Sequence, residues 1–231
     1  GDGELRAPLG LGIDSNDRIY IADHSNHRIA IFTNTGTWVE NIGGATRRID
    51  DARKVIKKFL SEDDIVANTN FGLMTWAWKD SNTILQAEVN EDGAKNILKI
   101  IDSIDYIPSA GTNLGGAMTK ARRYFRGGLP NPKGGVYKSP KNEKAEKCEN
   151  NYIIVISDGG WPDGTDPDTI AKDLVKSDKV GSLVVGYKGY TDYKLLYESF
   201  AKAGQIKKGD NYVGGEPLYA DNAAKLLKQL R

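Results

Sequence analysis

Cysteine and histidine are both scarce in this chain of 231 residues. Cys148 is the only cysteine, which excludes an internal disulfide and a cysteine-based zinc cluster. The only histidines, His24 and His27, lie far from Cys148 in the sequence, so no cysteine–histidine pair suited to thiol catalysis is present. Because no other pairing of a nucleophile with a base is visible, we expect a protein that is not an enzyme.

An excess of charge of one sign is also missing, as are long apolar runs. Lysine and arginine number 32 against 31 acidic residues, a net charge of +1 that gives no electrostatic reason to expect nucleic acid or a membrane surface as a partner. The apolar runs fall well short of the roughly 18 residues that a membrane span needs. The length and the 39% hydrophobic content suit one sizeable α/β domain, with or without a small appendage.

The first 44 residues are typical of short antiparallel strands. Three apolar runs at 18–23, 28–32 and 37–43 are separated by turn-forming stretches rich in Ser, Asn, Asp and Gly. This pattern predicts a small N-terminal β-meander.

From Ala45 onward the pattern changes to alternating helices and strands. An amphipathic helix is expected at 45–61, and two strands at 70–78 and 82–90 should form an antiparallel hairpin. Residues 126–149 are expected to form a long polar loop. Further strands are expected at 151–157, 179–187 and weakly within 210–220, and further helices at 92–104, 113–125, 167–177, 193–204 and 221–230. The alternation predicts a three-layer α/β/α fold with a doubly wound, mostly parallel sheet.

Two loops should lie at the ligand-binding rim of such a sheet. "SAGTNLGG" (109–116) leads into a helix, and "SDGGWPDG" (157–164) follows an apolar strand. The hydroxyl of Thr112 and the carboxylate of Asp158 are hard oxygen donors of the kind that Mg²⁺ accepts. The alternatives are that Asp158 only forms a polar turn and that Thr112 only caps the helix.

The order of these segments resembles a von Willebrand factor type A domain over residues 45–231. The stretches that carry the resemblance are "NFGLMTW", "GTNLGGA", "NYIIVISDG" and "YADNAAKLLKQL". Domains of this family hold a metal ion in an adhesion site built from an Asp-x-Ser-x-Ser loop, a threonine and an aspartate. The resemblance places the threonine at Thr112 and the aspartate at Asp158, and implies a Mg²⁺, Ca²⁺ or Mn²⁺ ion that bridges to an acidic group of a partner protein.

The Asp-x-Ser-x-Ser loop is missing where the family would have it, before the helix at 45–61. Residues 1–44 instead resemble an NHL repeat, one blade of a β-propeller, through "RIYIAD", "NHRIAIF" and Gly36. Asp23 and Ser25 are the nearest substitute for the missing ligands, although the repeat pattern itself accounts for Asp23. A site without its first loop leaves a second hypothesis open, that of a metal-free module that only assembles into a larger structure.

A narrower resemblance concerns "SPKNEKAEKCENNYIIVISDGGWPDG", which is similar to the approach to this aspartate in the PilY family of type IV pilus tip adhesins. It implies a prokaryotic protein at the cell surface or outside the cell. The implied partners are pilus subunits or a surface ligand with an acidic group.

Further acids and a tryptophan surround Asp158. We interpret Asp163, Asp166 and Asp168 as turn and helix-start residues rather than additional ligands. Trp161 has two equally supported interpretations, an exposed contact residue beside the site or a side chain of the fold.

Overall fold

The computed structural model describes residues 3–26, 28–43, 48–77, 79, 83–104, 112–141, 150–161, 164–187, 190–208 and 210–220. The chain separates into two compact units, Gly1–Asp51 and Ala52–Arg231. In the part of the chain described, no helix is long and apolar enough to cross a membrane.

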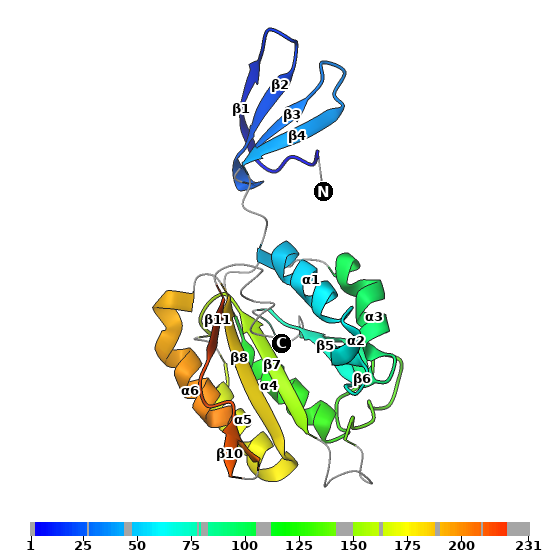
Figure 1. Ribbon diagram of the computed structural model, residues 1–231, viewed down its shortest axis with the longest axis vertical. Coiled ribbons are helices and arrows are strands. Elements are labelled where there is room, and N and C mark those ends of the chain that lie inside the picture. Colours follow the sequence, from blue (N-terminus) through cyan, green and yellow to red (C-terminus); the bar gives the residue numbers. More distant parts are fainter. Residues whose placement is uncertain are drawn as a thin grey trace. The chain divides into compact units, whose positions relative to one another are not determined.

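The N-terminal unit is a four-stranded antiparallel sheet in sequential order (Figure 1). Its strands are β1 (Pro8–Ile13), β2 (Ile19–Asp23), β3 (Arg28–Phe32) and β4 (Trp38–Gly43). The predicted meander is confirmed, but the sequence pattern missed β1. This strand contains Gly10 and Gly12, which have low strand propensity, and it is held by pairing with β2 along its length.

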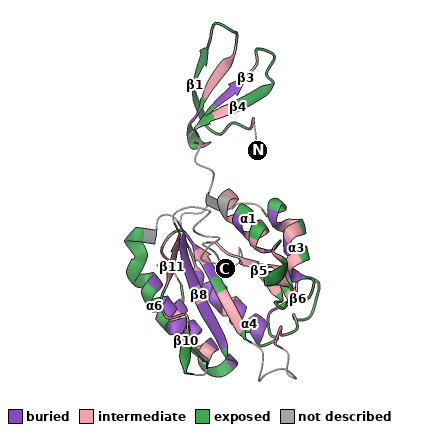
Figure 2. Cartoon of the chain, in the orientation of Figure 1, coloured by how far each residue is buried: buried purple, intermediate pink, exposed green. Residues whose placement is uncertain are grey.

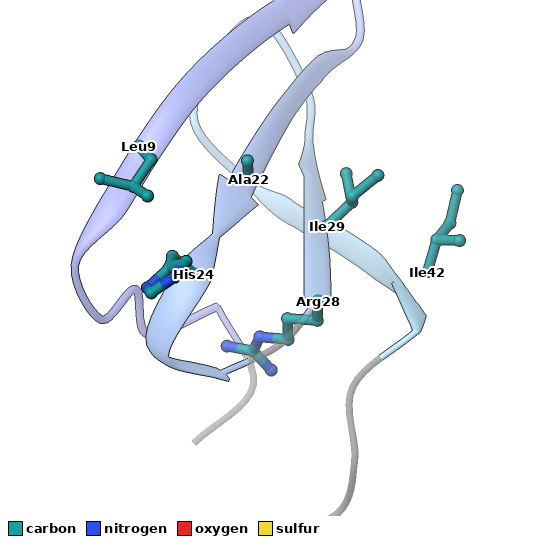
Figure 3. A pocket seen from close by; sticks show the side chains of 6 residues that line it. All are labelled: Leu9, Ala22, His24, Arg28, Ile29 and Ile42. Carbon is teal, nitrogen blue, oxygen red and sulfur yellow. The ribbon is translucent and has the colours of Figure 1, made fainter.

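The sheet of the N-terminal unit leaves large apolar side chains in solvent. Leu9 is 73% exposed, Leu11 67% and Ile13 64%, and burial in this unit is confined to a few central residues (Figure 2). Figure 3 shows a shallow hollow on this sheet, with the side chains of Leu9, Ile29 and Ile42 around it. A single four-stranded sheet has no second layer of its own that could cover its apolar face.

The second unit contains helices and strands in alternation. Its strands are β5 (Phe71–Thr75), β6 (Ile84–Asn90), β7 (Asn151–Ser157), β8 (Val180–Tyr187), β9 (Ile206–Lys208), β10 (Asn211–Val213) and β11 (Leu218–Ala220). Its α-helices are α1 (Arg48–Phe59), α2 (Asp63–Val66), α3 (Gly93–Ile100), α4 (Leu114–Phe125), α5 (Pro167–Asp173) and α6 (Lys194–Gly204). A π-helical turn, Leu174–Asp178, extends α5. The predicted helix at 221–230 and part of the predicted loop at 126–149 lie outside the described residues.

Parallel strands form the centre of this unit. β8 lies between β7 and β11 and pairs with both in parallel, with Val155 opposite Val184. β8 is buried along nearly its whole length, as expected for a strand covered on both faces. The antiparallel hairpin of β5 and β6 is confirmed and forms a separate ladder.

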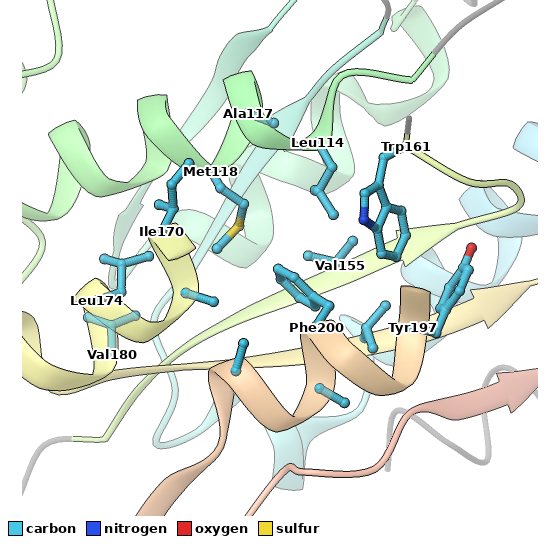
Figure 4. Close-up of a cluster of buried hydrophobic side chains, with 14 of the residues drawn as sticks. Leu114, Ala117, Met118, Val155, Trp161, Ile170, Leu174, Val180, Tyr197 and Phe200 are labelled. Atoms are coloured by element: carbon cyan, nitrogen blue, oxygen red, sulfur yellow. The ribbon is translucent and has the colours of Figure 1, made fainter. Parts of the chain in front are cut away.

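Helices cover both faces of these strands. On one face, α4, α5 and α6 bury a cluster of side chains that includes Met118, Val155 and Phe200 (Figure 4). On the other face, Val55 of α1 packs with Val185 and Tyr187. Adjacent residues of a strand point to opposite faces, so α1 lies opposite α4–α6. The predicted three-layer α/β/α class is therefore confirmed.

A buried carboxylate joins α4 to the end of the α5 segment. Asp178 has a side chain only 5% exposed, and its oxygens accept hydrogen bonds from Arg126 at 2.8 and 3.0 Å and from Lys141 at 3.1 Å. Burial raises the pKa of Asp178, but the hydrogen bonds from the two cations lower it more, so the net pKa lies below the ordinary 3.8. A lowered pKa means that the carboxylate contributes stability above its unfolded pKa and loses it as the pH falls.

We predict that Asp178→Asn lowers the free energy of unfolding by about 1–3 kcal/mol at pH 7, because Arg126 and Lys141 lose a charged acceptor. The difference from wild type should shrink as the pH falls below about 4, because the unfolded chain then binds a proton that the folded carboxylate takes up only at lower pH. Urea denaturation of the variant and of wild type at pH 7 and at pH 3 measures the loss of unfolding free energy and its decrease at low pH. Asp102→Asn is the control, since that side chain is 68% exposed in its ion pair with Lys57 and should contribute less than about 1 kcal/mol. An equal effect of the two variants at pH 7 would contradict the prediction.

A second prediction concerns the start of α4. A Cβ atom at Gly115 would lie 1.6 Å from the carbonyl oxygen of Thr165, which is backbone and cannot move aside cheaply. Gly115→Ala should therefore destabilise the unit by about 1–3 kcal/mol, although the same change in an open helix stabilises. Gly159→Ala is the matched control, because a Cβ there meets nothing within 4 Å. Thermal melts of both variants check this, and a Gly115→Ala protein as stable as wild type would show that the contact is wrong.

Candidate functional site

The candidate site begins where β7 ends. Ser157 is the last residue of the strand and is 7% exposed, whereas Asp158 directly after it is exposed to solvent. The Ser157 hydroxyl donates a hydrogen bond to the carbonyl oxygen of Gly159, 3.2 Å away. The carboxylate of Asp158 thus lies at the carboxyl end of a parallel strand, the edge at which folds of this class bind ligands.

Tyr197 of α6 holds the backbone on either side of Asp158. Its hydroxyl lies 3.1 Å from the carbonyl oxygen of Ser157 and 2.9 Å from that of Gly159, and can donate to either. Tyr197 is fully buried, and burial raises its pKa to about 12. The phenol therefore stays protonated and remains a donor at any physiological pH. No motif in the sequence marks Tyr197 for this role, since only the fold brings α6 against this turn.

Trp161 is a buried side chain of the fold, so the interpretation of an exposed contact residue is wrong. It is 5% exposed and lies against the ring of Tyr197, with 4.7 Å between ring centroids, and against Phe200 at 5.9 Å (Figure 4). The turn folds back tightly enough to bring Gly160 against the ring of Tyr193, where a Cβ would lie 2.4 Å from a ring carbon. The large apolar area of the indole explains its burial.

Thr112 lies directly before α4 and is partly buried. The cap of this helix is Asn113, whose Oδ1 accepts a hydrogen bond from the backbone N–H of Gly116 at 2.7 Å. The helix thus receives its side-chain cap from Asn113, and the hydroxyl of Thr112 is not the group that caps α4.

The two loops predicted to share a rim come into contact. Gly164 has a φ of +88°, and a Cβ there would lie 2.5 Å from Oδ1 of Asn113. A Cβ at Gly115 would lie even closer to the neighbouring loop, 1.6 Å from the carbonyl oxygen of Thr165. The loop that Asp158 opens therefore packs on the turn that follows Thr112, and glycine is required at both positions for this approach.

The acids behind Asp158 have structural roles, as the sequence predicted. Asp166 caps α5 by accepting hydrogen bonds from the backbone N–H groups of Asp168 and Thr169 and from the Thr169 hydroxyl, which lower its pKa. Asp168 accepts a hydrogen bond from Ser199 of α6, and burial raises its pKa. Asp163 lies outside the described residues.

Asp23, the suggested substitute ligand, is fully buried in the N-terminal unit. Its oxygens accept hydrogen bonds from the N–H of Arg6 at 2.6 Å, the amide of Asn26 at 2.7 Å and Nε of Arg28 at 2.8 Å. Burial raises the pKa of Asp23, but the three hydrogen bonds together lower it by more, so the net pKa lies below the ordinary value of 3.8. The carboxylate therefore joins the chain before β1 to the β2–β3 connection, and both its oxygens are already in use.

A hollow lined by polar groups lies beside this rim, at a position that no sequence prediction covered. Its lining includes Thr119, Lys120 and Arg123 of α4, together with Thr165. The signal in the sequence was the spacing of three, four and seven residues from Gly116, which places these side chains on one helix face.

The donor chemistry of the site suits a hard divalent cation only in part. One carboxylate and one hydroxyl are hard oxygen donors, and Mg²⁺ accepts such a set when waters or a partner fill the remaining positions. Over the described stretches of the chain, no group of three or more His, Cys, Asp or Glu side chains could hold a metal.

Comparisons with known proteins agree with this architecture. The sequence profile of the von Willebrand factor type A domain matches residues 42–212, and that of the NHL repeat matches residues 5–32. A search of curated proteins found no significant match.

Solved structures share the fold at low sequence identity. Proximal thread matrix protein 1 from the mussel byssus is 15% identical, with a TM-score of 0.55 over 80% of this chain. The chain spans 41% of that protein, which has also been solved with a zinc-occupied adhesion motif. BatB from Bacteroides thetaiotaomicron is 19% identical, with a TM-score of 0.52 over 79% of this chain and 84% of its own.

The profile match covers more than half of the chain, and the parallel sheet between two helical layers is the fold that its structural relatives share. Domains with this profile are interaction or adhesion modules, and they bind divalent cations at a metal-ion-dependent adhesion site. The chain belongs to the von Willebrand factor type A family.

Proposed function

We propose that this chain binds a partner protein through a divalent cation held by Thr112 and Asp158, with an acidic group of the partner completing the coordination. The observation that carries the proposal is the exposed carboxylate of Asp158 at the end of β7, on a backbone fixed by Tyr197. A preset backbone lowers the entropic cost of forming a metal site. Mg²⁺, Ca²⁺ and Mn²⁺ are the candidate ions.

We further propose that the module acts outside the cell or at the cell surface, at the tip of a type IV pilus. The support is the resemblance of "SPKNEKAEKCENNYIIVISDGGWPDG" to pilus tip adhesins, together with the adhesive character of the family. Its partners would be pilus subunits or a surface ligand that presents a carboxylate.

The second candidate is a structural assembly module whose site binds no metal. One observation favours it: in the described ranges, Asp158 belongs to no group of three or more His, Cys, Asp or Glu side chains that could hold a metal. Binding measurements separate the two candidates.

Isothermal titration with MgCl₂, CaCl₂ and MnCl₂ should give a saturable heat for at least one ion. Asp158→Ala should weaken that binding by more than about tenfold, because it removes the only charged ligand of the pair, and Thr112→Ala should weaken it less. Asp210→Ala, which removes another exposed acid, is the control and should leave the heat unchanged.

The melting temperature of Asp158→Ala without metal should stay within about 2 °C of wild type, because an exposed side chain contributes little to stability. The absence of heat with all three ions would reject the metal site and favour the structural module.

A further inference from the structure

The polar hollow beside the rim has a cationic lining. Its volume is about 190 Å³, and its charged lining residues are Lys120 and Arg123 of α4. Among the described residues that line it, the others are asparagine, glycine and threonine, and none is acidic. Sites for drug-sized ligands have volumes of about 300–1,000 Å³, so this hollow suits one side chain or a small ion.

The two cations lie on the outer face of α4. Lys120 and Arg123 are four and seven residues after Gly116, whereas Leu114 and Met118 of the same helix are buried in the core. Long side chains on a helix lean toward its N-terminus. Lys120 and Arg123 are therefore directed toward the first turn of α4, which follows Thr112 at the rim.

Lys120 is held in position by the β5–β6 hairpin. Its Nζ donates a hydrogen bond to the carbonyl oxygen of Thr83, 2.8 Å away and directly before β6. Thr83 is 4% exposed, so the acceptor belongs to the interior of the unit. A hydrogen bond to a neutral carbonyl fixes the ammonium group and leaves its charge intact. The positive charge is therefore in place before any ligand arrives.

Arg123 differs from the arginines beside it. Arg122 forms an ion pair with Asp173 at 2.8 Å, and Arg126 forms one with Asp178 at 2.8 Å, so both join α4 to the α5 segment. Within the described part of the chain, Arg123 forms no ion pair, and the residue is exposed. A guanidinium group stays charged, and its planar fork matches the two oxygens of a carboxylate. Arg123 therefore has donors to offer to an anion.

The loop at 164–165 supplies a further part of the lining. A Cβ at Gly115 would lie 1.6 Å from the carbonyl oxygen of Thr165, so this loop is packed directly on the first turn of α4. The hydroxyl of Thr165, an exposed residue, can rotate to donate to an anion. The hydroxyl of Thr119 instead donates to the carbonyl oxygen of Gly115 at 2.9 Å. The hollow thus combines a guanidinium, an ammonium and a hydroxyl group.

We propose that this hollow binds an acidic side chain of a partner protein, with the carboxylate on Arg123 and beside Lys120. Charge complementarity selects an anion, and the small volume selects a single acidic side chain over a larger ligand. A partner protein supplies that side chain, because the family consists of interaction modules and the hollow lies beside the rim of Asp158. The hollow needs no metal, so it shares only the partner protein with the proposed function.

Two short peptides are suitable probes for the full chain, acetyl-Gly-Glu-Gly-amide and its neutral counterpart acetyl-Gly-Gln-Gly-amide. With a chelator present, the glutamate peptide should shift the backbone amide NMR signals of Gly116, Thr119 and Thr165 saturably. The dissociation constant should be on the order of 1 mM, because a single partly exposed charge pair binds weakly. The glutamine peptide should bind at least about tenfold more weakly, since it lacks the charge.

Arg123→Gln should weaken binding of the glutamate peptide by at least about fivefold, because it removes the charged fork. Arg123→Lys keeps the charge but not the fork, so its affinity should lie between those of wild type and Arg123→Gln. Lys202→Gln is the matched control: it removes one positive charge from an exposed position on α6 and should bind as wild type does. The spectra of the free variants show in the same experiment that each is folded.

Three outcomes would overturn the proposal: no saturable shifts, equal binding of the two peptides, or an unchanged affinity of Arg123→Gln. Inorganic phosphate is titrated in the same way. If phosphate binds at least about tenfold more tightly than the glutamate peptide, the hollow is a phosphate site, which would also overturn the proposal. Asp158→Ala should bind the glutamate peptide at least as tightly as wild type does, so failure of the metal site and failure of this hollow are distinguishable.

Discussion

Coverage of the parallel strands by helices on both faces is the constraint on which the α/β unit depends. Val155 points to the layer of α4, α5 and α6, and Ile156 points to the layer of α1. A strand that is apolar on both faces can be covered only by two layers of helices. The same arrangement fixes where β7 ends, and hence where the first polar group after it reaches solvent. The position of Asp158 is therefore a consequence of how the core is packed.

The hydroxyl of Tyr197 links that core to the rim. A fully buried phenol needs a hydrogen-bond acceptor, and the carbonyl oxygens of Ser157 and Gly159 provide two. Trp161 packs on the same ring, so the residues on both sides of Asp158 are held by the interior of the protein. This is how a loop with two adjacent glycines, Gly159 and Gly160, acquires a defined course.

The strands of the α/β unit form separate ladders, whereas single helices extend across more than one of them. The helices α1 and α4 each reach from the parallel strands to the hairpin, but no ladder among the described residues joins β7 to β5. The N-terminal unit shows a related feature, since Leu9, Leu11 and Ile13 of β1 are largely exposed.

The sequence by itself determined the elements and their class. Continuous apolar runs located β7 and β8, and amphipathic periodicity located the helices around them, because these patterns reflect local geometry and burial. It also placed Asp166 among the turn and helix-start residues, since caps depend on a few neighbouring residues. The assignment of Thr112 and Asp158 as metal ligands came from a family resemblance and stays a prediction.

Tertiary structure alone decided the rest, because it depends on residues distant in the sequence. The burial of Trp161 and the hydrogen bonds of Tyr197 arise from α6, about 40 residues from β7 along the chain. The strand β1 exists through pairing with β2, despite its glycines. The pairing partners of β7 were likewise invisible to the sequence pattern. An apolar run reports that a strand is built to be buried, but only the packing of α1 on one face and of α4–α6 on the other shows which elements cover it.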